Sequence, residues 1–147
     1  MFDSSLLELW GYSPAVLDQG GQPIALCEGA MPAVVFHRHA KRLANRRALF
    51  FLDNTSALHS FVKGRAGPPA LDRSIAFTNF VACHAAVTTW WEFVPSKLNW
   101  ADGISRLLGA DPFARTHGFP ISRVTVDRRI WLGDLQAAWE LARSDVE

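Results

Sequence analysis

The sequence predicts an α/β domain in which helices cover a largely parallel sheet. The first observation is the order of the predicted elements, which runs strand, helix, strand, helix, helix, strand and helix. The second is Ala48–Leu52, a run of five apolar residues with the length of a buried central strand. The third is composition: with 49% hydrophobic and 20% charged residues in 147, the chain can form a real core and carries too little charge for a disordered chain.

The first half of this order rests on a change of pattern after residue 23. A short strand is expected near Ile24–Leu26, and a helix from about Glu28 to Leu43. Pro32 falls inside that helix, and proline is tolerated best near a helix start. The apolar run Ala48–Leu52 then forms the central strand.

The second half has clearer boundaries. Gly64 is expected to end the first of two helices, and Pro95 to end a strand that is β-branched and aromatic in composition (TTWWEFV). The four predicted elements are a helix at Thr55–Lys63, a helix at Ala70–Val87, a strand at Thr88–Val94 and a helix at Asn99–Leu108.

The character of the chain changes after Gly109. The stretch DPFARTHGFPIS is typical of a loop, RVTV favours an extended segment, and Ile130–Ala142 favours a terminal amphipathic helix. The sequence therefore predicts a domain over residues 1–109 and a C-terminal extension over residues 110–147.

Bulk properties exclude several classes of protein. The net charge of +1 predicts no global basic field. Cys27 and Cys83 lack the spacing of a disulfide framework or a zinc site. No signal peptide and no apolar run long enough to span a membrane are expected. We expect an intracellular protein, cytoplasmic or nuclear, with no membrane partner.

Two acids occupy positions where α/β sheets collect functional groups, at or just after strand ends. Asp53 follows the apolar strand directly, and an unpaired charge beside an apolar interior is costly. Its alternative role is as N-cap of the next helix, a role that Asn54 or Thr55 could equally fill. Asp102 falls at the start of a predicted helix, where an acid is also favoured by the helix dipole.

Together, LDNTSAL (52–58) and VPSKLNWADGISR (94–106) resemble the ribonuclease H-like domain of reverse transcriptases and retrotransposon polyproteins. The resemblance covers about residues 24–108. The matching positions of the later motif are Val94, Ser96, Asn99, Ala101, Asp102, Ser105 and Arg106.

The resemblance implies a ribonuclease H-like fold with a mixed central sheet, helices on both faces and a truncated N-terminal meander. It also implies a cluster of catalytic acids, to which Glu28, Asp53 and Asp102 would belong as ligands of two Mg²⁺ (or Mn²⁺) ions, with Asp3 as a possible fourth. Carboxylate oxygens are the ligands that Mg²⁺ prefers. The implied contacts to nucleic acid are Asn54, Lys97, Asn99, Ser105 and Arg106.

The implied function is metal-dependent hydrolysis of the RNA strand of RNA–DNA hybrids, with a reverse transcriptase domain of a parent polyprotein as a candidate partner. Two alternatives stay open. One is a degenerate, non-catalytic domain of the same fold that binds nucleic acid weakly or is only structural. The other is an integrase-type polynucleotidyl transferase, against which the Asn-x-Ala-Asp motif argues.

Overall fold

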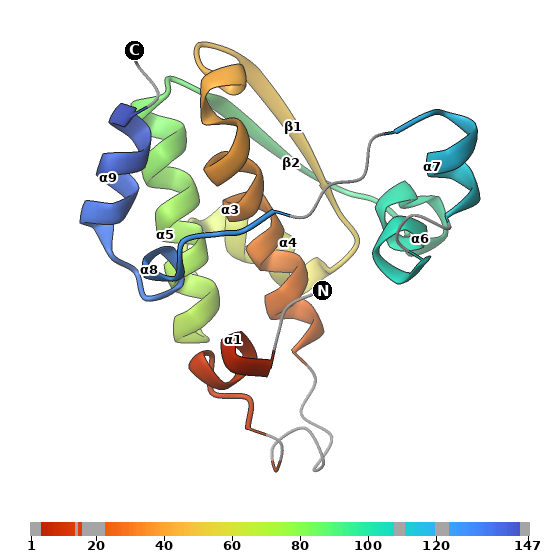
Figure 1. Cartoon of the computed structure of the whole chain (residues 1–147), viewed down its shortest axis with the longest axis horizontal. Coiled ribbons are helices and arrows are strands. Elements are labelled where there is room, and N and C mark those ends of the chain that lie inside the picture. The colour runs from red at the N-terminus through yellow and green to blue at the C-terminus, as the bar shows by residue number, and fades with distance from the viewer. Residues whose placement is uncertain (1–3, 14, 16–22, 108–110, 120–123, 145–147) are drawn as a thin grey trace.

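The computed structural model describes residues 4–13, 15, 23–107, 111–119 and 124–144 (Figure 1). Within them, helices surround one face of a small sheet. The elements are α1 (Ser4–Leu9), α3 (Ile24–Leu43), β1 (Arg47–Leu52), α4 (Thr55–Lys63), α5 (Pro69–His84), β2 (Thr88–Phe93), the 3₁₀ turn η1 (Ser96–Leu98), α6 (Trp100–Leu107), α7 (Pro112–Thr116), α8 (Arg128–Trp131) and α9 (Leu135–Ser144).

The sheet consists, in the described part of the chain, of β1 and β2 running parallel. Arg47 is level with Thr88 and Leu52 with Phe93, so both strands end at the same edge. The expected parallel pairing is confirmed. The mixed sheet that the resemblance implies is not found among the described residues, which contain no antiparallel strand pair.

An aromatic stack joins one face of the sheet to the helices. Phe50 and Trp91 are register partners with ring centroids 4.7 Å apart. Phe36 of α3 stacks on Phe50 at 5.8 Å, and Phe61 of α4 stacks on Trp91 at 4.2 Å. Aromatic pairs of this kind add to the stabilisation that burial of apolar area already supplies. The stack therefore fixes α3 and α4 over the same face.

The other face of the sheet is bare in the described structure. Leu49 and Phe51 are each 56% exposed, and Trp90 is 66% exposed. The expectation of helices on both faces is therefore wrong for the described residues. Ala48–Leu52 alternates between the helix-covered face and solvent, so it is not the strand buried on both sides that its apolar run predicted.

The predicted strand at Ile24–Leu26 is wrong, because these residues form the first turn of α3. A short apolar run fits a buried helix as well as a strand, and Pro23 immediately precedes the helix. Pro32 lies inside α3 and is fully buried. Because proline has no backbone N–H, the carbonyl of Glu28, four residues earlier, lacks its usual helical hydrogen bond.

The two turns that lead from helix to strand are tied to each other. Asn45 and Ala86 both have left-handed backbone angles, with φ of 59° and 51°. The N–H of Asn45 donates to the carbonyl of Ala85 at 2.9 Å, and the N–H of Thr88 donates to the carbonyl of Arg46 at 3.0 Å. As a result α3 and α5 end side by side and deliver β1 and β2 in register (Figure 1).

The C-terminal segment belongs to the same core as the rest. Helices α8 and α9 both pack on α5, and Trp131 of α8 meets Trp10 edge-on at 5.3 Å. The predicted helix at 130–142 is divided in two at Gly133, where φ is +77°. Helix α7 occupies part of the predicted loop, and residues 124–126 of the predicted extended segment belong to no strand of the described sheet. The predicted boundary at 109 falls outside the described residues.

No helix among the described residues combines the length and the apolar character that crossing a membrane requires.

Candidate active site

Asp53 occupies the bend between β1 and α4, at the carboxyl edge of the sheet. The cap of α4 is not Asp53 but Asn54, whose Oδ1 accepts a hydrogen bond from the N–H of Ala57 at 3.0 Å. Capping satisfies one of the N–H groups that a helix start leaves unpaired. The Asp53 carboxylate is therefore not consumed by the helix start, and it lies partly buried at the rim.

Glu28 reaches this rim from the second turn of α3 and is also partly buried. Its carboxylate accepts a hydrogen bond from the Asn54 side chain. Only the amide nitrogen of asparagine can donate, so Asn54 uses its oxygen to cap α4 and its nitrogen to hold Glu28. One short side chain thus links α3 to the end of β1.

Asp102 lies in the first turn of α6, the helix that follows β2 and η1 in the chain. Asn99 prepares this turn: its Oδ1 accepts from the N–H of Ala101 at 3.1 Å, and its carbonyl accepts from the N–H of Asp102 at 3.1 Å. Gly103 follows, and a Cβ there would collide with the carboxylate of Asp111, which caps α7. Gly103 therefore lets α7 pack tightly beside Asp102. Figure 1 shows α6 and α7 beyond the carboxyl end of β2.

The three predicted acids act on one another electrostatically. The pKa of Glu28 is raised, first by burial and then by the charge of Asp53, while the hydrogen bond from Asn54 lowers it and the charge of Asp102 raises it. Like charges at close range disfavour ionisation. Asp53 and Asp102 are therefore near enough to Glu28 for their charges to act on its carboxylate, and the shared metal site stays a prediction.

These acids do not form a closed ligand set. Among the described residues, no group of three or more His, Cys, Asp or Glu side chains lies close enough together to hold a metal ion. Carboxylate oxygens are nevertheless the type of donor that Mg²⁺ prefers. Glu28 and Asp53 form no ion pair with a basic residue in the part of the chain that is described.

The structure describes only some of the remaining predicted site residues. Lys97 lies in the exposed turn η1. Asn54 and Asn99 have capping roles, which does not test their predicted contact with nucleic acid. The side chains of Ser105 and Arg106 lie outside the described part. Asp3 does too, and the residues that follow it form helix α1 where a first strand carrying Asp3 would continue.

Two features of the structure, apart from the three predicted acids, were not predicted from the sequence. Cys27 neighbours Glu28, and its thiol has a raised pKa because of burial and the charge of Glu28, which makes it a poor nucleophile. The second is a polar stripe on α4 made by Ser56, His59, Ser60 and Lys63. Spacings of three and four residues put these side chains on one helix face, so the pattern was visible in the sequence.

Comparison with known proteins finds no matching family model, no matching curated protein and no matching solved structure.

Proposed function

We propose that this protein is a metal-dependent ribonuclease H-type endonuclease that hydrolyses the RNA strand of RNA–DNA hybrids, as part of or derived from a retroelement reverse transcriptase. The observation that carries the proposal is that the charges of Asp53 and Asp102 both raise the pKa of Glu28, which is expected if the three carboxylates face one rim. The late motif VPSKLNWADGISR supports the same assignment through its resemblance to that family.

Clustered carboxylates suit this chemistry because their repulsion is relieved by a divalent cation. Glu28, Asp53 and Asp102 would hold the metal. When bound, two Mg²⁺ ions supply an activated water and stabilise the leaving oxygen of a phosphodiester. Asn54 keeps the Glu28 carboxylate turned to the rim and so positions it for binding.

Lys97 supports a nucleic-acid substrate. Lys97 is an exposed cation in η1, two positions before Asn99, and suits contact with phosphate. Phosphate contacts position a nucleic acid without reading its sequence. A hybrid is recognised in this way, by the shape of its groove and its 2′-hydroxyls. A reverse transcriptase domain remains the candidate partner.

The decisive experiment is cleavage of an RNA–DNA hybrid, labelled on the RNA strand, in the presence of Mg²⁺. We expect the wild-type chain to cut the RNA, and Asp53→Asn and Asp102→Asn each to reduce the rate at least a hundredfold while leaving the fold intact by circular dichroism. Asp134→Asn, which changes an acid between α8 and α9, is the matched control and should retain the wild-type rate. Equal rates in all four proteins would refute the proposal.

A second candidate is a non-catalytic domain of the same fold. The lack of a closed three-ligand group among the described residues favours it. It predicts that the hybrid is bound with no Mg²⁺-dependent cutting by any of these proteins.

A further inference from the structure

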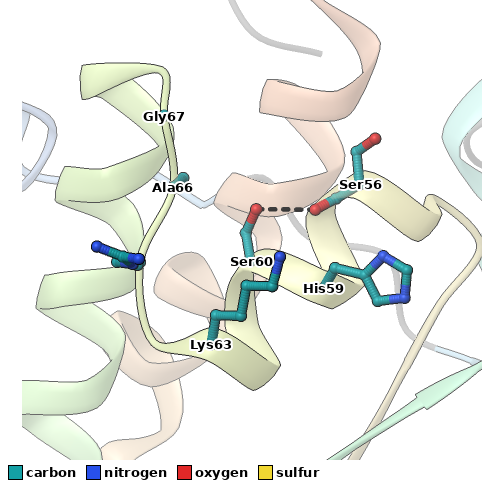
Figure 2. Close-up of a pocket in the computed structure, with 7 residues that line it drawn as sticks. Ser56, His59, Ser60, Lys63, Ala66 and Gly67 are labelled. Atoms are coloured by element: carbon teal, nitrogen blue, oxygen red, sulfur yellow. Dashed lines mark hydrogen bonds between the residues drawn. The ribbon is translucent and has the colours of Figure 1, made fainter.

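An open hollow on the described surface lies beside α4. It is open to solvent, has a volume of about 510 Å³, and is lined by Ser56, His59, Ser60 and Lys63 of α4 together with the loop 65–67 (Figure 2). We call this lining the α4 shelf. Figure 2 shows the α4 side chains on one side of it and the loop on the other.

The shelf is basic. Lys63 and Arg65 contribute two full positive charges, His59 adds a third when protonated, and no acidic side chain lines the hollow. Among the described residues, neither Lys63 nor Arg65 forms an ion pair. The charge of the shelf is therefore left for a ligand to neutralise.

The loop that carries Arg65 is held in place before any ligand arrives. Gly64 ends α4 with φ of +72°, and the N–H of Arg65 donates to the carbonyl of Ser60 at 3.1 Å. The N–H of Ala66 donates to the carboxylate of Asp72 at 2.8 Å. Two anchors on successive residues fix the backbone at Arg65, which lowers the entropy cost of binding there.

The hydroxyl groups of the shelf add directional contacts. Ser60 donates its O–H to the carbonyl of Ser56 at 2.8 Å, so its oxygen can only accept further bonds. The hydroxyl of Ser56 stays able to donate. Lys63, Arg65 and Ser56 together offer the set of donors that suits phosphate oxygens.

The position of the shelf relates it to the candidate active site. Helix α4 begins right after Asn54, and the shelf follows it from Ser56 in its first turn to Lys63 at its end. Nine helical residues span roughly 13 Å, which corresponds to about four nucleotides at the axial rise of one strand. One continuous nucleic-acid strand can therefore reach from the acids to the shelf.

We propose that the α4 shelf binds backbone phosphates of the nucleic-acid substrate, with its Lys63 and Arg65 end about four nucleotides from the scissile bond. This inference rests on the proposed function and assigns a second contact to the same substrate. It uses phosphate charge alone and reads no sequence.

The test measures binding of a fluorescent RNA–DNA hybrid by anisotropy, without divalent metal so that nothing is cut, over a series of salt concentrations. Each lost phosphate contact should reduce the slope of log K against log salt by about 0.9. We expect that loss in Arg65→Gln and about twice that loss in Arg65→Gln with Lys63→Gln. Arg128→Gln, an exposed arginine on α8, is the control of equal charge and should keep the wild-type slope.

The outcomes separate this inference from the proposed function. Unchanged slopes in the shelf variants, with cleavage that depends on Asp53, would overturn the shelf alone. Shelf-dependent slopes without any cleavage would overturn the nuclease and support the shelf. If labelled poly-glutamate loses affinity in the shelf variants while the hybrid does not, the ligand is an acidic peptide and the inference is wrong.

Discussion

The charge of Asp53 raises the pKa of Glu28, although the two residues come from different elements, α3 and the end of β1. The side chain of Asn54, which follows Asp53 in the sequence, donates a hydrogen bond to Glu28 and also caps α4. This relationship ties the acidic rim to the start of a helix, so changes to the rim should affect folding stability as well as function.

The first prediction concerns pH and Glu28. Because its pKa is raised above the ordinary value of 4.5, the folded chain binds this proton more tightly than the unfolded chain. The stabilisation is complete below pH 4.5 and is lost as pH rises through the raised pKa. Urea unfolding from acidic to neutral pH should show that Glu28→Gln removes this loss and is modestly more stable than wild type at neutral pH.

The control is Glu8→Gln, on the exposed side of α1. A stability–pH curve for Glu28→Gln that parallels wild type throughout would contradict the assignment of Glu28 to a crowded acidic rim.

The second prediction concerns metal linkage. A cation that binds the folded rim and not the unfolded chain stabilises the fold, by about 2.7 kcal/mol when free metal is a hundred times Kd. For a chain of this size that raises Tm by several degrees. Differential scanning fluorimetry with Mg²⁺ should show the rise in wild type and not in Asp53→Asn with Asp102→Asn. NaCl at matched ionic strength controls for screening, and an equal rise in the double variant would argue against a rim site.

The third prediction separates the two roles of Asn54. Asn54→Ala removes the cap and the donor to Glu28 and should cost about 1 kcal/mol in unfolding free energy. Asn54→Ser keeps a capping oxygen and should recover most of that loss. By NMR titration, the pKa of Glu28 should move upward in the alanine variant, since the hydrogen bond that lowers it is gone. Identical stability of the two variants would show that the cap is unimportant.

The fourth prediction tests the helix-to-strand turn at Ala86, where φ is 51°. A residue with a Cβ is strained at this φ by about 1–2 kcal/mol. Glycine avoids the strain, and the conformational entropy that it adds to the unfolded chain costs a smaller free energy. Ala86→Gly should therefore stabilise the protein by about 0.5–1 kcal/mol in chemical denaturation. Ala76→Gly, at an exposed position inside α5, should instead lose about 1 kcal/mol. Destabilisation by both changes would refute the strain at Ala86.

Elements with strong chemical boundaries could be predicted from the sequence. Gly64, with its left-handed angle, ends α4 where expected, and the β-branched and aromatic run before Pro95 forms β2 within one residue of the expected end. The rim acids could be predicted for the same kind of reason, because parallel strands bring their carboxyl ends to one edge. That rule accounts for Asp53 directly after β1 and for Asp102 in the first helix after β2, while a metal site shared by them stays a prediction.

Other features depend on packing that no local pattern contains. The apolar run Ile24–Leu26 fits a strand as well as a helix. Packing of Leu26 in the assembled core favours the helix, and the local sequence does not show that packing. The exposure of Leu49 and Phe51 reflects how many elements cover the sheet, which the strand itself does not encode. The link from Asn54 to Glu28 joins residues that are distant in sequence, so spacing could not reveal it.

Pro32 gives the acidic rim some freedom of adjustment. Because the carbonyl of Glu28 accepts no hydrogen bond from Pro32, one backbone hydrogen bond fewer joins the first turns of α3 to the rest of that helix. Glu28 therefore lies in the part of α3 before the proline. Asp53, in contrast, directly follows a strand, and Asp102 lies in a turn that Asn99 caps. If a metal ion binds the three carboxylates as proposed, Glu28 is the one expected to move toward it.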